Sequence, residues 1–371
     1  MTVPSSPSDR RTIELYEQGA EVWRSRRTPD HQAARAFGDT LGAQGLSGPI
    51  IDLGCGPGWL TQYLGPDAVA LDGARAMLDL VPEFAPAAPR VQGDVADLPV
   101  RDGALAGALA ARVYVHLPRS EVPAALGDLH RALRVHAPVE LVVFGDEPAE
   151  LRTIENDLLD GRQFSVWDHE SLTDTLIGAG FAIDDWSQHR PDGSTFTSLT
   201  VRLRRRRSLA DTLGSGLELV ICGLNPSLHA ADAGVGFVSP SNRFWPAALA
   251  AELVTVDRDP WHAFRRHRVG MTDLVKRATT KASEVDADEY RAGLARLERQ
   301  LAWLQPAAVC FVGLAGWRAA VDPKATAGWQ TQRLAGVPVY LMPSTSGLNA
   351  SSQLPDFVEH LRAVREPPPD H

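Results

Sequence analysis

Cysteine is scarce in this sequence: Cys55, Cys222 and Cys310 are the only three in 371 residues, and they lie far apart. An odd number argues against a disulfide framework, and without a C-x-x-C pair we expect no zinc or iron–sulfur site. No apolar run approaches the roughly 18 residues of a membrane-spanning helix, and Met1 to Ser6 lack the layout of a signal peptide. We therefore expect a cytoplasmic protein with no membrane partner.

Net positive charge is also missing, since 37 Lys and Arg face 46 Asp and Glu, a formal net charge of -9. The imbalance lies in the first half of the chain. Residues 1–207 contain 21 Lys and Arg against 29 Asp and Glu, which leaves 16 against 17 for the remainder. The second half is nearly neutral and can bind DNA through a local basic face, with strong salt dependence.

Length and composition favour two globular domains. A chain of 371 residues with 44% hydrophobic and 22% charged residues can bury two cores of ordinary size. We place the first domain at residues 1–205 and the second at residues 210–368. The arginine run 202–207 at the junction fits a solvated strand end with a linker, and a phosphate-contacting patch is the alternative.

Residues 49–59, PIIDLGCGPGW, predict a strand, a glycine turn and the start of a helix. Such glycines let a ligand touch backbone N–H groups near a helix N-terminus. The G-x-G-x-G spacing differs from the G-x-G-x-x-G of dinucleotide folds, which argues against a nicotinamide cofactor. A second predicted strand ends at Asp72, where a carboxylate is placed to bind ribose hydroxyls, and Asp94 follows in the segment GDVADLP.

Together these residues resemble the class I S-adenosylmethionine-dependent methyltransferases of the small-molecule type. The resemblance implies a Rossmann-like α/β domain with a mostly parallel seven-stranded sheet, and S-adenosylmethionine as its cofactor. The cofactor-binding residues that it implies are Asp52, Gly54, Gly56 and Gly58 around the methionine part, Asp72 at the ribose and Asp94 at the adenine.

The rest of the first half fits this resemblance with one departure. We expect one or two helices within 12–40, strands at 104–114 and 139–144, helices at 121–133 and 170–179, and antiparallel closing strands near 183–186 and 196–203. The family usually carries turn glycines before the strand at 139, whereas residues 134–138 read RVHAP.

The methyl acceptor is not readable from the sequence. We find no Asp/Asn-Pro-Pro-Tyr segment and no Pro-Cys nucleophile, so direct methylation of DNA bases is disfavoured. Four side chains are candidate contacts for the acceptor, with a place in the core or on the surface as the alternative for each: Tyr16, Trp23, Tyr114 and His116.

The stretch 217–245, LELVICGLNPSLHAADAGVGFVSPSNRFW, organises the second half. A short apolar strand ends at Cys222, and the turn that follows leaves Asn225 beyond its carboxyl end, where open α/β sheets bind ligands. Gly234 and Gly236 precede Phe237, so the backbone can approach a flat ligand closely while the ring covers it. An amide, free N–H groups and a ring suit a nucleobase.

This ordered set resembles the mismatch-specific uracil/thymine DNA glycosylase family, within the uracil-DNA glycosylase superfamily, over about the last 160 residues. The matching segments are GLNP at 223–226, NRFW at 242–245, GMTDLV at 270–275, WLQP at 303–306 and MPSTSGL at 342–348. The resemblance implies an α/β/α domain that needs no cofactor, and a partner that is double-stranded DNA with a mismatched uracil.

The resemblance also implies the roles of particular residues. Asn225 is the expected catalytic residue, which holds the attacking water. The base pocket is expected at Gly223, Leu224, Ser227, Ala230 and Phe237. The loop that fills the vacated base stack is expected at Ser346, Gly347 and Leu348.

Some catalytic consequences follow from the residue types. An amide does not titrate, so Asn225 cannot act as a general base and we expect slow turnover. The small Ala230 and Gly236 leave room for a 5-substituent, so uracil opposite guanine is the expected substrate, with thymine or ethenocytosine next. Ala350 stands where some relatives carry an arginine that grips the orphaned guanine. Uracil opposite other bases or in single strands is therefore an open alternative.

The sequence predicts a monomeric, bifunctional enzyme, a monofunctional DNA glycosylase fused to a methyltransferase. Two alternatives stay open. The methyltransferase is the main activity in the first, with the C-terminal domain as a DNA-binding module. In the second, the N-terminal domain binds S-adenosylmethionine without catalysing a transfer.

Overall fold

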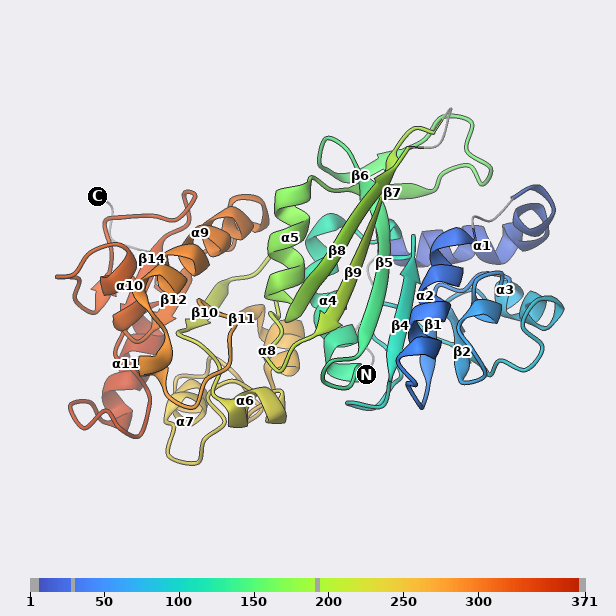
Figure 1. Cartoon of the computed structure of the whole chain (residues 1–371). Helices are drawn as coiled ribbons and strands as arrows, with labels where there is room; N and C mark the ends of the chain where they lie inside the picture. The colour runs from blue at the N-terminus through green and yellow to red at the C-terminus, as the bar shows by residue number, and fades with distance from the viewer. Residues whose placement is uncertain (1–6, 28–30, 191–193, 367–371) are drawn as a thin grey trace. The chain divides into compact units, whose positions relative to one another are not determined.

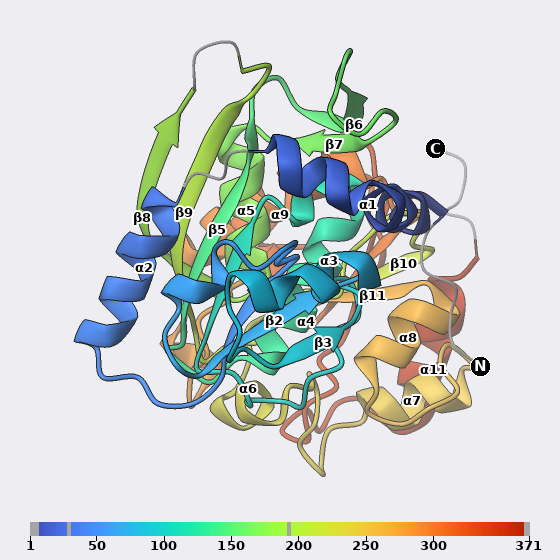
Figure 2. The same cartoon turned by 90° about the vertical axis from the view of Figure 1, so that its right-hand side faces the viewer.

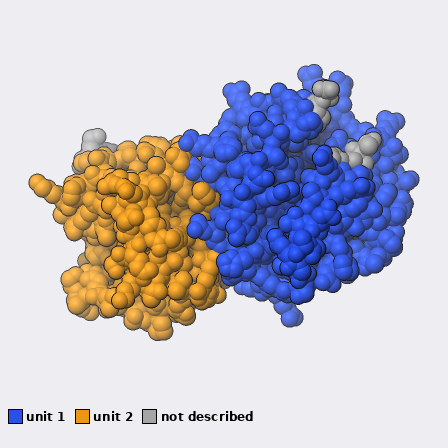
Figure 3. All heavy atoms as spheres, in the orientation of Figure 1, with its two compact units in different colours: residues 1–176, 181–206 blue, residues 177–180, 207–371 orange. Residues whose placement is uncertain are grey.

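A computed structural model describes residues 7–27, 31–190 and 194–366. The chain divides into two compact units, one of Met1–Leu176 and Phe181–Arg206, the other of Ile177–Gly180 and Arg207–His371 (Figure 3). No helix in these described ranges is long and apolar enough to cross a membrane. The segment Met1 to Ser6, on which the expectation about a signal peptide rests, lies outside them.

Unit 1 is built on a seven-stranded sheet in the order β3-β2-β1-β4-β5-β9-β8 (Figure 1). The first five strands pair in parallel, and β9 is antiparallel to both β5 and β8. This confirms the mostly parallel sheet that the sequence predicts. The strands are β1 Ile50–Leu53, β2 Ala68–Asp72, β3 Arg90–Gln92, β4 Gly107–Ala111, β5 Pro138–Gly145, β8 Phe181–His189 and β9 Thr197–Arg205.

Helices cover this sheet through apolar side chains at helical spacing. Ala34, Phe37 and Leu41 of α2 pack with Ile50 of β1 and Leu109 of β4 in one cluster. At the β2 end of the sheet, α1 lies beside α3 (Figure 2). The α-helices of this part of the chain are α1 Pro7–Arg26, α2 Gln32–Ala43, α3 Arg75–Leu80, α4 Val122–Ala132 and α5 His169–Gly178.

Two local features differ from the sequence prediction. The strand expected at 104–114 is shorter, because the chain turns into a 3₁₀ helix at Tyr114–His116. A hairpin of β6 Ala149–Thr153 and β7 Gln163–Val166 was not expected. Further 3₁₀ turns lie at Thr61–Tyr63, Val81–Glu83, Arg119–Glu121 and, in unit 2, Ala282–Glu284.

Unit 2 is an α/β/α sandwich around a five-stranded sheet in the order β11-β10-β12-β14-β13. Alternate side chains of each strand face opposite layers, as the two-residue period of a strand requires. Its strands are β10 Leu219–Gly223, β11 Val269–Asp273, β12 Val309–Val312, β13 Gly328–Trp329 and β14 Val339–Met342. All pairs are parallel except β13 with β14, which confirms the expected layered α/β domain.

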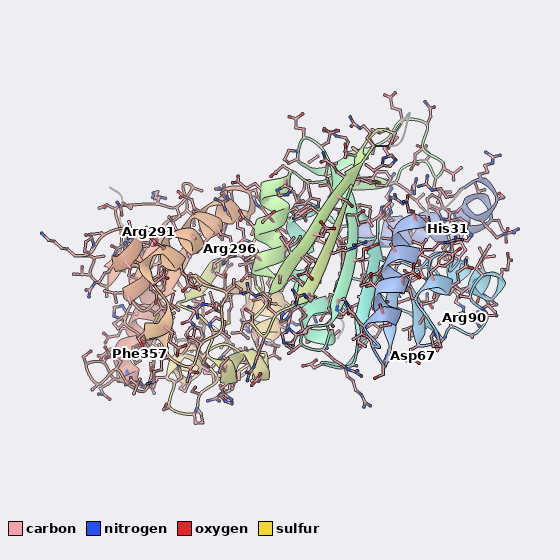
Figure 4. All side chains as sticks on the ribbon, viewed as in Figure 1. His31, Asp67, Arg90, Arg291, Arg296 and Phe357 are labelled. Carbon is pink, nitrogen blue, oxygen red and sulfur yellow. The ribbon has the colours of Figure 1, made fainter. Side chains whose placement is uncertain are left out.

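Each face of this sheet carries its own helices. Ile221 of β10 belongs to a core that includes Trp245 and Phe357, whereas Cys222 belongs to one that includes Leu297 and Trp317. Figure 4 marks Phe357 on α11 and Arg296 on α9, one in each layer. The helices are α6 Leu228–Ala233, α7 Phe244–Ala250, α8 Pro260–His267, α9 Ala287–Leu304, α10 Ala315–Ala320 and α11 Leu354–Ala363.

Candidate functional sites

A cavity of about 500 Å³ in unit 1 opens beside the glycine loop that follows β1. Gly54, Gly56 and Gly58 all have positive φ, at 64°, 53° and 85°. A Cβ on Gly54 would lie 2.4 Å from Val113, and one on Gly58 would lie 3.1 Å from Val81. A Cβ on Gly56 would have no heavy atom closer than 4.0 Å, so this glycine keeps space open beside the cavity.

Asp72 fixes the shape of that loop. One carboxylate oxygen accepts a hydrogen bond from the Gly56 N–H at 2.9 Å, and the other accepts from the Ala74 N–H at 2.9 Å. Burial raises the pKa of Asp72 to about 6, although these hydrogen bonds favour the charged form. The side chain lines the cavity, as the predicted ribose contact requires.

The other predicted cofactor residues fall into two groups. Gly54 and Asp94 line the cavity, and the Asp94 carboxylate accepts from the Ala96 N–H at 2.9 Å. Asp52 and Gly58 do not line it. Asp52 is buried, accepts from Thr61 Oγ1 at 2.6 Å, and has a pKa raised to about 7 by burial. It therefore supports the loop from below instead of facing the cavity.

The far part of the cavity carries a hydrogen-bonded chain of side chains. Tyr16 Oη and His116 Nε2 are 3.0 Å apart, and Arg162 Nη1 donates to Tyr16 Oη at 2.7 Å. His116 Nδ1 lies 3.2 Å from the Gln163 carbonyl, which only accepts, so Nδ1 carries the proton. Burial, with the charge of Arg162, lowers the pKa of His116 to about 4, so the ring is neutral at pH 7 and Nε2 accepts from Tyr16.

This chain fixes the Tyr16 hydroxyl at the wall of the cavity. Three of the four predicted acceptor contacts, Tyr16, Trp23 and His116, line the cavity. The fourth, Tyr114, is fully buried and does not line it, so its core alternative holds. Arg162 was missed because its hairpin was not expected; it is held by an ion pair with Asp157.

In unit 2, two loops at the carboxyl ends of β10 and β11 are joined by backbone hydrogen bonds. Leu274 and Val275 N–H donate to the carbonyls of Gly223 and Leu224, both at 2.9 Å. Further along, Thr279 N–H donates to the Pro226 carbonyl at 3.1 Å. The predicted Asn225 turn is therefore braced along its length by the segment 274–279.

Asn225 is oriented by three acceptors. Its Nδ2 donates to the Pro226 carbonyl at 3.2 Å, the Arg277 carbonyl at 3.1 Å and Thr279 Oγ1 at 2.8 Å. An amide nitrogen has two hydrogens, so these contacts saturate it. The side-chain oxygen, which accepts no hydrogen bond from any described residue, is the atom left to hold a water.

The predicted pocket residues surround this turn. Phe237 stacks on Phe244 with ring centroids 4.4 Å apart, and Ser227 Oγ caps α6 by accepting from the Ala230 N–H at 3.1 Å. Within the described residues the backbone N–H groups of Leu224, Ser227 and Phe237 donate no hydrogen bond. These three donors are available to an acceptor-rich ligand.

The predicted wedge loop is held from within the unit. Leu348 is 95% exposed, and a Cβ on Gly347 would lie 2.6 Å from Ser241 Oγ, so the loop packs closely at that point. Arg243 donates to the carbonyls of Ser346, Asn349 and Ser352 at 2.8, 2.6 and 2.6 Å. One guanidinium thus holds three carbonyls of the loop and leaves the leucine projecting.

The arginine run at 202–207 is largely neutralised inside its own units. Arg202 pairs with Glu140, Arg204 with Asp184, and Arg207 with Asp232. The strand β9 continues to Arg205, so most of this run is strand, as the structural alternative expected. Because these guanidinium groups already form ion pairs with carboxylates, a phosphate-contacting patch is the weaker interpretation of the run.

Comparison with known proteins gives two sequence matches. Residues 211–365 match the family described as "Uracil DNA glycosylase superfamily", and residues 50–136 match the family described as "Methyltransferase domain". These two matches bear out the resemblances found in the sequence.

Three solved structures illustrate the similarity of this chain to known proteins. A 1,6-didemethyltoxoflavin-N1-methyltransferase from Burkholderia thailandensis is 21% identical to this chain, with a TM-score of 0.43. The matched region covers 56% of this chain and 93% of the methyltransferase. A magnesium protoporphyrin IX methyltransferase from Synechocystis is 16% identical, with 53% and 99% covered and a TM-score of 0.43. A DhpI complex with S-adenosylhomocysteine is 22% identical, with 55% and 99% covered and a TM-score of 0.43.

Proposed function

Since the chain carries both a uracil DNA glycosylase superfamily domain and a methyltransferase domain, we propose that it is a bifunctional enzyme. Residues 210–368 form a glycosylase that hydrolyses the N-glycosidic bond of uracil in mismatched DNA. Residues 1–205 form a methyltransferase that uses S-adenosylmethionine. The observation that carries the proposal is the anchored Asn225 amide beside three free backbone N–H groups at the carboxyl end of a parallel sheet.

Excision of uracil needs a placed water and stabilisation of the departing base. The Asn225 oxygen accepts a hydrogen bond from the water and so orients the water oxygen toward C1′ of the extruded nucleotide. The C1′–N1 bond breaks, the water oxygen bonds to C1′, and the proton that the water loses ends on the base. The N–H groups of Leu224, Ser227 and Phe237, which donate no hydrogen bond within the described residues, are proposed to stabilise the negative charge that develops on the uracil oxygens.

Leu348 is proposed to fill the stack that the extruded base leaves, since apolar wedges hold stacked bases apart. We expect Leu348→Ala to slow uracil release from a duplex roughly ten-fold, because the extruded state loses about 1–2 kcal/mol of apolar contact. Release from a single-stranded oligonucleotide, which has no stack to fill, should not change. Equal losses on both substrates would contradict the wedge role.

The cavity of unit 1 fits S-adenosylmethionine in two respects. The open space beside Gly56 admits a ligand against the backbone, and the Asp72 carboxylate lines the wall where ribose hydroxyls would bind. The cofactor supplies an electrophilic methyl group on a sulfonium. An acceptor with an N–H or O–H group loses its proton to water when it is methylated, and the Tyr16 hydroxyl, which lines the cavity, can hold that acceptor by a hydrogen bond.

Both halves of the proposal are tested with the whole protein. A labelled duplex with one uracil opposite guanine is incubated with and without S-adenosylmethionine, and alkali-labile breaks are counted; breaks with the wild type support the glycosylase. Duplex binding without breaks would favour a DNA-binding module instead. Calorimetry with S-adenosylmethionine tests the first domain, and cofactor binding without methylation of any screened acceptor would favour a non-catalytic module.

A further inference from the structure

Asp273 lies at the base pocket, although the sequence analysis gave it no role. It is the last residue of β11 and pairs in register with Gly223, the last residue of β10. One of its carboxylate oxygens lies 2.4 Å from where a Cβ on Gly223 would be, and the Phe237 ring lies 3.5 Å from the same point. The carboxylate and the proposed stacking ring therefore share one small space, which the missing side chain at 223 leaves open.

The Asp273 carboxylate is buried without a hydrogen-bond partner among the described residues. The residue is only 9% exposed, yet within the described residues no hydrogen bond or ion pair reaches either side-chain oxygen. Both of its side-chain oxygens keep some contact with solvent. A buried carboxylate costs several kcal/mol unless it is paired, so this arrangement points to an external hydrogen-bond donor.

The cations near Asp273 are committed elsewhere. Lys276 Nζ donates to Asp211 at 2.7 Å, and Arg296 Nη1 lies 3.2 Å from the other oxygen of Asp211. Arg296 reaches Asp273 only at its backbone carbonyl, at 2.9 Å. The charges of Lys276, Arg296 and Asp211 sum to +1. An ionised Asp273 balances this charge.

The charge state follows from these surroundings. Burial raises the pKa of Asp273 to about 6, and Asp211 acts in the same direction, whereas Lys276 and Arg296 lower it. Cys222, the remaining titratable neighbour on β10, stays a neutral thiol because burial raises its pKa. Above pH 6 the group is therefore mainly a carboxylate, which accepts hydrogen bonds and donates none.

We propose that Asp273 is a specificity-determining residue that accepts a hydrogen bond from an exocyclic amino group, so that the glycosylase domain also releases cytosine-type bases from mispairs. This inference rests on the proposed glycosylase function and names a further substrate class for it. A carboxylate that accepts from cytosine N4 is a recognised means of reading this base, whereas the uracil O4 presents a second acceptor and repels it. Hydrolysis proceeds as for uracil, with the water oxygen bonded to C1′ and its proton on the released base.

The test compares three bases in one sequence, each opposite thymine so that none is Watson–Crick paired: uracil, cytosine and 3,N4-ethenocytosine. Single-turnover release is measured at pH 7.5 for the whole wild-type protein. We expect cytosine to be released, and ethenocytosine, whose bridged N4 has no free amino group, to be disfavoured. The ratio of cytosine to uracil rates is the readout.

Asp273→Asn is the key variant because it keeps the size of the side chain and adds an N–H donor that suits uracil O4. We expect the ratio of cytosine to uracil rates to fall ten-fold or more, mostly through faster uracil release and slower cytosine release. In the wild type the ratio should also fall below pH 6, where a protonated carboxyl donates to O4. Asp288→Asn, which removes an equal charge from an exposed side chain of α9, should leave the ratio unchanged.

The outcomes separate this inference from the function on which it rests. Uracil release with no cytosine release, or with an unchanged ratio in Asp273→Asn, would overturn the base-reading role and leave the glycosylase intact. Equal losses on all three bases, with a lower unfolding temperature, would show a structural role instead. No release of any base by any variant would overturn both proposals.

Discussion

Asn225→Ala should lower the single-turnover rate of uracil release about 100- to 1,000-fold, the usual cost of removing one preorganised polar group from an active site. The variant lacks the oxygen that is proposed to hold the water, and nothing else in the turn replaces it. The unfolding temperature should fall only slightly, because the backbone bonds between segments 223–226 and 274–279 do not use this side chain. Quench-flow or manual sampling with a labelled duplex measures the rate.

Asn225→Asp is the informative partner variant. The carboxylate has the same size but no N–H to donate, so one of its oxygens would face the carbonyls of Pro226 and Arg277, where Nδ2 now lies at 3.2 and 3.1 Å. We expect release well below the wild-type rate because the side chain turns away. A faster reaction than wild type would mean that activation of the water, and not its position, limits excision.

Asp72→Ala should weaken the binding of S-adenosylmethionine 100-fold or more. The carboxylate acts twice: it is the proposed ribose acceptor, and it fixes the glycine loop through the Gly56 and Ala74 N–H groups. Each hydrogen bond from a ribose hydroxyl to a charged carboxylate contributes about 1.5–3 kcal/mol, so the loss of two such bonds is enough for a 100-fold weaker affinity. Isothermal titration calorimetry with the whole protein measures the dissociation constant.

The control and the pH dependence sharpen that test. Asp79→Ala, on the exposed side of α3 and paired with Arg75, should bind the cofactor like the wild type. Because burial raises the pKa of Asp72 to about 6, the group loses charge as the pH falls through 6. Ribose hydroxyls donate more strongly to the charged form, so affinity should decline below pH 6 and level off above it. Affinity independent of pH would place the ribose elsewhere.

The sequence predicted the parts of the fold that local patterns encode. Glycine turns after short apolar strands indicated both candidate sites, and the run 219–222, apolar at every position, forms a strand whose two faces pack into different cores. The loop before β5 shows a limit of such rules. It lacks the expected glycines, yet His136 takes φ of 69° and makes the turn. The strand pairing and register around it override the preference of a single residue.

The sites were less predictable where they depend on contacts between distant segments. Arg162 contacts Tyr16 from a hairpin almost 150 positions away in the sequence, and no local sequence pattern predicts that contact. Asp273 stood inside a matching segment, but its significance lies in its burial and in the commitment of Lys276 and Arg296 to Asp211. Tyr114 shows the converse, since an aromatic residue after a strand proved to be core.

The three carbonyls held by Arg243 have a thermodynamic consequence for DNA binding. A leucine on a mobile loop would lose conformational entropy each time it entered a duplex, at about 1–2 kcal/mol per residue ordered. Here the hydrogen bonds from Arg243 already order the loop, so this conformational entropy is lost on folding and not on DNA binding. Association should therefore show a small entropic penalty from the protein, with most of the ordering confined to the extruded nucleotide.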